Sequence, residues 1–309
     1  MKKIAFIVAY IGKFGGYFPY FLTSCKYNPS VDFLFFTDDV QYLNRGGYSS
    51  NVKFIEVTFD ELKSRAQRYC DFEISLEYPY KLCEYRPMYG LMFEDYLKDY
   101  DYWGHCDTDM IFGDIRKFLG DAIESGKYRR ILRHGHLTLY HNDEYTNNIF
   151  REVYPDILDY KTAFQSRKLC AFDEAGGSAL IWLRHHMDEL YENLDYLYCF
   201  PLKYRKSFIG RGDNLLSLKY YNYKEGILTE HYIRNGESVT EERLYVHFYQ
   251  RSLKIGDDIT SSSFSIVPNK FVDYLGDNIS YVKRFLLCYR PFYPEYYISR
   301  IMKKIKSKL

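Results

Sequence analysis

Four short apolar runs, separated by segments with helical signals, dominate the first 106 residues. They are Ile4–Ile11, Val31–Phe36, Asn51–Val57 and Tyr102–Cys106. Continuous apolar runs of this length are typical of strands that are covered on both faces. Strands that alternate with helices form mostly parallel sheets, which bind ligands at the carboxyl ends of the strands. The pattern therefore predicts an α/β fold with its functional residues at those strand ends.

The helical signals between the runs are specific in places. Thr58 and Glu61 have the spacing of a capping box, which predicts that a helix begins at residue 59. We expect helices over Phe18–Cys25, 59–69, Tyr80–Leu97, Asn142–Tyr154 and Asp213–Tyr221. We expect later strands over Arg129–Arg133, His136–Tyr140, Gly177–Leu183 and Arg243–Tyr249.

Composition narrows the classes of protein that fit. The 42 Lys and Arg nearly balance the 41 Asp and Glu, and this near-neutral charge disfavours nucleic acid as a partner. Apolar residues make up 47% of the chain, which excludes a disordered protein. The seven cysteines form no C-x-x-C pair, and no apolar run of about 18 residues occurs. We therefore expect a reduced, cytoplasmic protein.

The end of the chain differs from the rest. Residues 256–263, rich in Asp and Ser, have the composition of a linker. From Lys283 to Leu309 there are eight Lys and Arg and one acid, Glu295, interleaved with apolar residues. We expect one domain over 1–255, then a linker and a basic amphipathic helical extension over 256–309. This extension either lies on the anionic cytoplasmic face of the inner membrane, as a peripheral contact, or packs on the domain.

The main chemical motif follows the strand Tyr102–Cys106. Asp107 and Asp109 are two residues apart, and both carboxylates can reach one ion from the end of that strand. Carboxylate oxygens that leave room for water and phosphate suit Mg²⁺ or Mn²⁺ bound with a diphosphate. Such a metal acts as a Lewis acid that neutralises charge on a departing nucleoside diphosphate.

The segment Cys106–Ile115, with Leu119 after it, resembles the D-x-D segment of retaining GT-A glycosyltransferases of the family 8 type. Together with Ser24–Pro29, Phe36–Asp39 and Pro79–Cys83, it also resembles an uncharacterised group of bacterial proteins from capsule and cell-wall polysaccharide clusters. The resemblance covers residues 1–255. It implies a GT-A fold, which is Rossmann-like with a mostly parallel sheet flanked by helices.

The resemblance also implies an activity. The protein would be a hexosyltransferase that moves a sugar from a nucleotide-diphosphate donor, expected to be a UDP-sugar, to a glycan or lipid-linked glycan in bacterial surface polysaccharide synthesis. The α configuration of the donor would be retained. The cofactor would be Mn²⁺ or Mg²⁺.

Roles carry over from the resemblance to matching positions. Asp107 and Asp109 would bind the metal, with His247 as a third ligand. The basic residue after that histidine stands at a different offset from the family pattern, so either Arg251 or Lys254 would contact the diphosphate. On the helix before the D-x-D motif, Lys81 and Arg86 would contact the diphosphate or the donor sugar.

The remaining candidates lie at other predicted strand ends and loops. Tyr10 and Asp38 would contact the base and ribose, although an acid after a strand is equally typical of a turn. Residues 172–177 loosely resemble the family's Asn-Ala-Gly segment, which implies that Asp173 or Glu174 would orient acceptor hydroxyls, or act as a base if the enzyme inverts. Asp213 belongs to a further segment expected near the sugar.

Two other functions fit the same residues. Haloacid-dehalogenase-type phosphatases also carry D-x-D after a strand, although they favour Thr or Val where this chain has Ile111 and place the motif near the first strand. A non-catalytic protein that binds nucleotide-sugars would share every binding residue.

Overall fold

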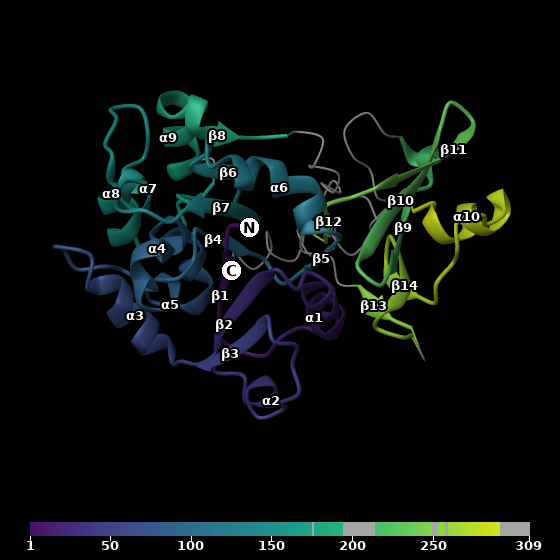
Figure 1. Ribbon diagram of the computed structural model, residues 1–309, viewed down its shortest axis with the longest axis horizontal. Coiled ribbons are helices and arrows are strands. Elements are labelled where there is room, and N and C mark those ends of the chain that lie inside the picture. Colours follow the sequence, from purple (N-terminus) through teal and green to yellow (C-terminus); the bar gives the residue numbers. More distant parts are fainter. Residues whose placement is uncertain (175, 194–213, 249–252, 257–258, 291–309) are drawn as a thin grey trace, which may run out of the picture. The chain divides into compact units, whose positions relative to one another are not determined.

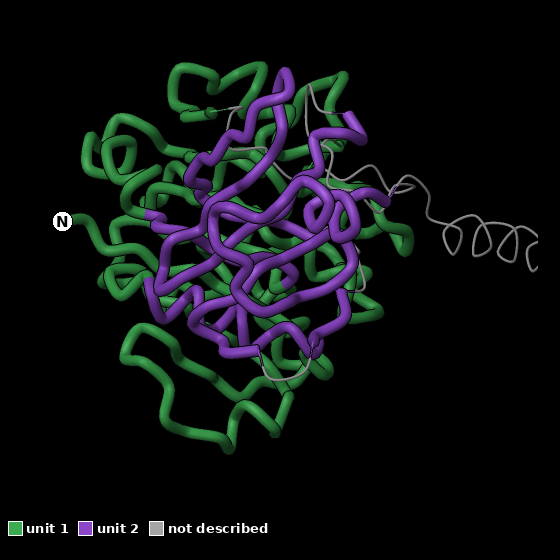
Figure 2. The backbone as a smooth tube through the Cα atoms, turned by 90° about the vertical axis from the view of Figure 1, so that its right-hand side faces the viewer, with its two compact units in different colours: residues 1–14, 28–108, 116–193 green, residues 15–27, 109–115, 194–309 purple. Residues whose placement is uncertain are grey.

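The computed structural model describes residues 1–174, 176–193, 214–248, 253–256 and 259–290. The chain folds into two compact units, shown in different colours in Figure 2. Unit 1 comprises residues 1–14, 28–108 and 116–193, and unit 2 comprises residues 15–27, 109–115 and 194–309. The chain therefore passes between the units several times.

Unit 1 contains a seven-stranded sheet in the order β3-β2-β1-β4-β7-β6-β8. β1 pairs in parallel with both β2 and β4, and β2 pairs in parallel with β3 (Figure 1). β7 runs antiparallel to β4 and β6, and β8 is parallel to β6. The strands are β1 (Ile4–Tyr10), β2 (Val31–Thr37), β3 (Val52–Glu56), β4 (Tyr102–Cys106), β6 (Arg130–His134), β7 (Leu137–His141) and β8 (Leu190–Tyr191). The prediction of a mixed α/β protein with a parallel-strand sheet is confirmed.

Helices flank this sheet, and their starts follow local sequence signals. The side chain of Thr58 accepts from the Glu61 N–H and that of Glu61 accepts from the Thr58 N–H, which confirms the capping box at α3. The predicted helix over Tyr80–Leu97 is broken into a 3₁₀ helix and two short α-helices, because Pro87 has no N–H to donate. The helices are α2 (Val40–Leu43), α3 (Phe59–Gln67), η1 (Pro79–Met88), α4 (Tyr89–Met92), α5 (Glu94–Leu97), α6 (Ile115–Ser125), α7 (Glu144–Asn148), η2 (Ile149–Arg151), α8 (Tyr160–Gln165), α9 (Ser178–His185) and η3 (Met187–Glu189).

The predicted strand Gly177–Leu183 is wrong, because these residues form most of α9. A short apolar run does not distinguish a buried strand from a buried helix. The buried positions are Ser178, Ala179, Ile181 and Trp182, which lie on one side of a helix rather than alternating as in a strand.

The core of unit 1 holds both tryptophans of the chain. Trp103 on β4 and Trp182 on α9 are almost completely buried. Trp103 stacks on Tyr140 with 4.5 Å between ring centroids, and its indole N–H donates to Asn147 Oδ1 at 2.7 Å. The indole therefore anchors α7 to the central strand β4.

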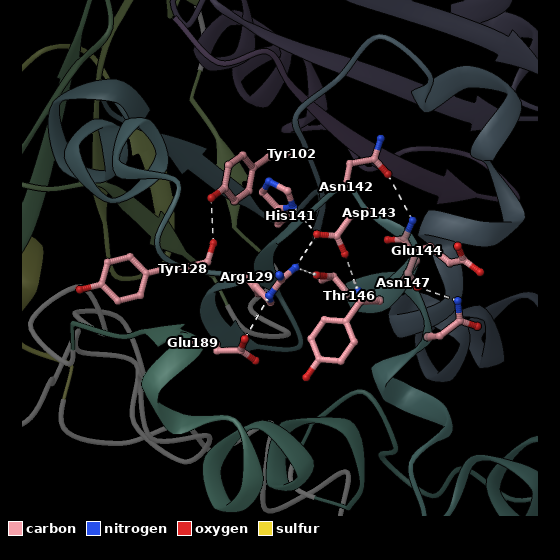
Figure 3. A network of polar contacts seen from close by, with 12 residues as sticks. Tyr102, Tyr128, Arg129, His141, Asn142, Asp143, Glu144, Thr146, Asn147 and Glu189 are labelled. Carbon is pink, nitrogen blue, oxygen red and sulfur yellow. Dashed lines mark hydrogen bonds and ion pairs between the residues drawn. The ribbon is translucent and has the colours of Figure 1, made fainter.

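A polar network joins β7 to α7 and η3 in unit 1 (Figure 3). Arg129 pairs with Asp143 and with Glu189, and Asp143 caps α7 by accepting from the Thr146 N–H at 2.7 Å. Burial alone would raise the pKa of Asp143, but hydrogen bonds from Thr146, His141 and Arg129 lower it. The Asp143 carboxylate is therefore held in its charged form, in which it connects Arg129 to the start of α7.

Unit 2 contains a six-stranded sheet in the order β11-β10-β9-β14-β15-β13 and a separate two-stranded sheet of β12 and β5. α1 packs against β5, where the Phe112 N–H donates to Ser24 Oγ at 3.2 Å. The elements are α1 (Phe18–Lys26), β5 (Met110–Phe112), η5 (Leu215–Ser217), β9 (Tyr220–Lys224), β10 (Ile227–Arg234), β11 (Glu237–Glu242), β12 (Tyr245–His247), β13 (Lys254–Ile255), β14 (Ser263–Val267), β15 (Lys270–Val272) and α10 (Tyr281–Cys288).

Two sequence predictions differ from this unit. The expected helix over Asp213–Tyr221 is wrong in its described part, because a short 3₁₀ turn leads into β9, whose tyrosines are buried in a sheet. The domain boundary expected after residue 255 falls inside the six-stranded sheet, since β14 pairs with β9 and β15 pairs with β13.

Of the predicted basic helical extension, the structure describes α10 and the residues up to 290; residues 291–309 lie outside the described part. Within the described part of the chain, no helix is both long and apolar enough to cross a membrane.

Candidate functional site

Asp107 lies directly after β4, at the carboxyl end of the parallel part of the unit 1 sheet. Its backbone N–H donates to the His136 carbonyl at 2.9 Å, which extends the pairing of β4 with β7 beyond the last strand residue. Its carboxylate is 28% exposed and accepts a hydrogen bond from the guanidinium of Arg86. Asp107, which the sequence analysis assigned to the site, is therefore paired with a positively charged side chain from η1.

Arg86 connects two of the predicted acids. It projects from η1 and contacts Asp107, Asp173 Oδ2 at 3.4 Å and the Gly135 carbonyl at 2.5 Å. Burial alone would lower the pKa of Arg86, but the charges of Asp107 and Asp173 raise it well above its ordinary value. Arg86 is therefore a permanent cation between the D-x-D motif and the segment around Asp173.

Asp173 is the buried member of this group, with 5% of its side chain exposed. Burial is the largest effect on the pKa of Asp173; together with the charges of Glu174 and Asp107, and against the lowering effect of Arg86, it raises this pKa to about 7. Glu174 is exposed, and its carboxylate lies against Gly135 so closely that a Cβ there would overlap with Glu174 Oε1. Asp173 therefore lies beside Arg86, whereas Glu174 faces solvent.

Asp109 belongs to unit 2, where it meets His247. β5 and β12 pair antiparallel with Met110 opposite His247, and the Phe248 N–H donates to the Asp109 carbonyl at 2.8 Å. This register places an imidazole nitrogen, Nε2 of His247, 3.0 Å from Asp109 Oδ1. His247 is 5% exposed, so the strand pairing holds it in one position.

The D-x-D motif and β12 together supply a set of metal-ligand side chains. Among the described residues, Asp107, Asp109 and His247 form a group whose ligand atoms lie within 4.8 Å of one another. Two carboxylates and one imidazole match the oxygen-rich donor sets that suit Mn²⁺ and Mg²⁺, with coordination positions left for water or phosphate. The three residues that the sequence analysis assigned to a metal therefore fit one.

Lys81 does not lie where the sequence analysis expected it. Its ammonium is completely buried, pairs with the equally buried carboxylate of Glu84, and contacts the Lys168 carbonyl at 3.1 Å. A cation enclosed in this way has no face toward solvent for a diphosphate. Lys81 and Glu84 are neighbours because they stand three residues apart on η1. Glu84 also accepts a hydrogen bond from the Cys170 N–H, so the pair joins η1 to the segment around residues 168–170.

Tyr10 and Asp38 lie at the ends of β1 and β2 in unit 1. Asp38 Oδ1 accepts from the Gly12 N–H at 2.7 Å, which ties the loop after β1 to the end of β2. The Tyr10 ring stacks on Phe14 at 4.5 Å. Asp38 is exposed and Tyr10 is half-buried, so both side chains keep surface for a ligand while also serving the loop.

The later candidates are only partly described. Lys254 is exposed on β13 in unit 2, where its backbone N–H donates to the Asn269 carbonyl at 3.1 Å. Asp213 and Arg251 lie outside the described residues. The structure thus brings together Arg86, Asp107 and Asp173 in unit 1, and Asp109 with His247 in unit 2.

Two glycines contribute to the site without having been predicted in that role. Gly135, in the turn between β6 and β7, supplies the carbonyl that binds Arg86. Gly113, after β5, leaves no room for a side chain, because a Cβ there would overlap with the Arg243 carbonyl oxygen. The Gly113-Asp114 pair was part of the sequence resemblance, whereas nothing in the sequence marks the Gly135 carbonyl.

Comparison with known proteins gives a family without a function. No curated protein matches the chain. A family model described as "Family of unknown function (DUF6625)" matches residues 6–275, which include β14 and β15 beyond the boundary expected at 255. Because this match spans most of the 309 residues, the chain belongs to that family of unknown function, DUF6625.

Proposed function

We propose that this protein is a metal-dependent glycosyltransferase that uses a nucleoside-diphosphate sugar, with UDP as the expected nucleotide. The observation that carries the proposal is the group of Asp107, Asp109 and His247 at the end of β4. A metal held there would neutralise charge on the departing diphosphate. The donor set and its place after a parallel strand are both those expected from the sequence resemblance.

The surrounding residues support the same chemistry. Arg86 orients Asp107 through a charged hydrogen bond and adds a positive charge near the metal ligands, where a diphosphate would otherwise be repelled by the acids. Asp173 is held by the other side of the same guanidinium. We propose that Asp173, with the exposed Glu174, orients a hydroxyl of a glycan or lipid-linked glycan acceptor.

The fold is compatible with this proposal. The parallel order β3-β2-β1-β4 places the ends of β1, β2 and β4 along one edge, and these ends carry Tyr10, Asp38 and Asp107. An antiparallel strand, β7, follows beside β4. The finer assignment to the GT-A fold, with retention of the sugar configuration, is part of the proposal.

Thermal melting in the presence of nucleotides tests it. We expect UDP to raise the melting temperature only with Mn²⁺, because the metal would bridge the acids and the diphosphate. A ligand at about 100 times its Kd stabilises the folded protein by about 2.7 kcal/mol, which is large enough to detect. Asp109→Ala should abolish this shift. Asp273→Ala removes an exposed acid elsewhere in unit 2 and should keep it. GDP with Mn²⁺ is the control for the base.

Other results would replace the proposal. Absence of a shift with either nucleotide under any metal would contradict nucleotide binding. Phosphate release from simple phosphoesters, lost in Asp107→Asn, would instead indicate a phosphatase of the haloacid-dehalogenase type. A UDP-sugar that binds but is never turned over with any acceptor would indicate a non-catalytic binding protein.

A further inference from the structure

η1 is unusually long for a 3₁₀ helix. It runs over ten residues, Pro79–Met88, whereas runs longer than about four residues are uncommon. Because a 3₁₀ helix has three residues per turn, side chains three positions apart lie above one another. One side of η1 is buried in the core of unit 1 and consists of Leu82, Tyr85 and Met88. A second buried side consists of Lys81, Glu84 and Pro87.

The remaining side of η1 leads from solvent to the candidate site. It is formed by Tyr80, Cys83 and Arg86, and is called the outer face of η1 below. Exposure falls along this face, because Tyr80 is 67% exposed, Cys83 is half-buried and the Arg86 side chain is 18% exposed. Arg86 in turn contacts Asp107 and Asp173. The outer face therefore connects an exposed aromatic ring to the acids of the site.

The hydroxyl of Tyr80 is within electrostatic range of the same site. Burial is the largest effect that raises the pKa of Tyr80, followed by the charge of Cys83. The charges of Asp107 and Asp173 raise this pKa as well, whereas the charge of Arg86 lowers it. Tyr80 thus belongs electrostatically to the site, although most of the residue is open to solvent.

Further apolar surface adjoins the start of η1. Tyr78 is 36% exposed, and its carbonyl accepts from the Lys81 N–H at 3.1 Å. Leu169 is 45% exposed and belongs to the segment 168–170, whose Lys168 carbonyl accepts from Lys81 Nζ at 3.1 Å. Apolar side chains that are exposed beside a polar site are typical of a binding surface.

A sugar ring matches this combination of groups. The C–H groups of a sugar form an apolar face that packs on an aromatic ring, and its hydroxyls bind carboxylate and guanidinium groups. Because Arg86 is already paired with two acids, the outer face does not select an ionic ligand. A neutral saccharide is therefore the ligand that fits it.

We propose that Tyr80 is the platform for a sugar ring of the acceptor that lies beyond the ring that reacts. The inference rests on the proposed function, because it takes Asp107 and Asp173 to mark the place of sugar transfer. With a rise of about 2 Å per residue, Tyr80 lies about 12 Å along η1 from Arg86, which exceeds the length of one sugar ring. The acceptor is therefore a saccharide of at least two sugars.

Saccharide binding by the full chain tests this subsite. The protein, with UDP and Mn²⁺, is applied to an array of mono- and oligosaccharides, and the Kd is then measured for each saccharide that is captured. We expect capture of saccharides of two or more sugars. Tyr80→Ala should bind them about tenfold more weakly, because the aromatic contact is lost. Tyr80→Phe should keep the affinity, because it keeps the ring.

A matched control is Tyr281→Ala. Tyr281 is similarly exposed, at 58%, but lies on α10 in unit 2, so this variant should bind saccharides like the wild type. The melting temperature of each variant without ligand shows whether it folds. If Tyr80→Ala melts below the wild type, Tyr80→Leu, which keeps an apolar side chain without the ring, takes its place.

Failure of the subsite is distinguishable from failure of the proposed function. If UDP with Mn²⁺ raises the melting temperature but no saccharide is captured, or Tyr80→Ala binds saccharides unchanged, the subsite is overturned and the proposed function stands. An equal loss of affinity for single sugars would place Tyr80 at the reacting ring and overturn it as well. Loss of the UDP shift in Tyr80→Ala would assign the ring to the nucleotide base. Saccharide binding that needs Tyr80, without any UDP shift, would keep the saccharide site and refute the transferase.

Discussion

Asp173 is an acid whose surroundings disfavour its charge although a guanidinium contacts it. Burial is the largest effect on its pKa, and the nearby acids Asp107 and Glu174 act in the same direction. In the unfolded chain, by contrast, an aspartate titrates near its ordinary value. The folded protein therefore keeps a proton on Asp173 over a pH range in which the unfolded chain has lost it.

This difference makes stability depend on pH. A raised pKa in the folded state gives stability that is complete below the ordinary pKa and is lost as the pH rises toward about 7. Asp173→Asn cannot titrate, so its free energy of unfolding should gain on the wild type between pH about 4 and about 7, by at most about 4 kcal/mol. Urea unfolding at several pH values measures this. The exposed Asp273→Asn should show no such trend, and a flat difference for Asp173→Asn would contradict the raised pKa.

Single residues also show what sequence reasoning can supply. Asp107, Asp109 and His247 were assigned together from a motif and a resemblance, and their ligand atoms do lie together. Lys81 was assigned to a diphosphate on the same basis but is buried against Glu84, because the residue type and helix position alone do not reveal which side of η1 faces the core. The binding of Arg86 to the Gly135 carbonyl depends on a turn 49 residues away and leaves no local signal.

At the scale of elements, the strands of the first 106 residues and the pair β6 and β7 were predicted, whereas the strands β9 to β11 were not. β1 to β4 are rich in apolar residues, whereas β9 to β11 (YYNYK, ILTEHYIR and ESVTEE) mix apolar, polar and charged residues and so lack that signal. The pair Asn235-Gly236, with φ of 54° and 83°, is a strong short-range hairpin signal at the turn between β10 and β11, although no prediction was made from it. The pairing of β5 with β12 joins segments too far apart in sequence for any local pattern.

The pairing of β5 with β12 depends on Gly113. A methyl group in Gly113→Ala would push against the Arg243 backbone, so the strands must separate; we expect a loss of about 1–3 kcal/mol in stability. Because Asp109 and His247 flank this pairing, the variant should also lose the Mn²⁺-dependent stabilisation by UDP that the proposed function predicts. Gly120→Ala is the control: a Cβ in α6 meets no atom within 4 Å and should stabilise by up to about 1 kcal/mol. Differential scanning calorimetry compares the two, and equal stability would refute the close approach.

At the scale of the whole molecule, the chain does not divide where its composition changes. Residues 15–27 and 109–115 belong to unit 2 although they are surrounded in sequence by unit 1. The Asp- and Ser-rich segment after residue 255 resembled a linker because strand ends and linkers share the same turn residues. The sheet nevertheless continues through β14 and β15.

Truncations measure this continuity. A chain that ends at residue 255 lacks β14, the strand that pairs with β9. It therefore leaves one edge of β9 unpaired, and the tyrosines of β9 that are buried in the full chain lose part of their cover. We expect it to be insoluble or to melt without a cooperative transition. A chain that ends at residue 290 keeps all the strands that the structure describes and should melt cooperatively. Similar melting curves for the two truncations would show that the boundary at 255 is real.

The placement of the two tryptophans has an optical consequence. Both lie in the core of unit 1, and the many aromatic residues of unit 2 are Tyr and Phe. Selectively excited indole emission therefore reports on one unit alone, while circular dichroism of the peptide backbone reports on both. Denaturation followed by the two signals at once would reveal, without any added label, whether the two units unfold in one step or in sequence.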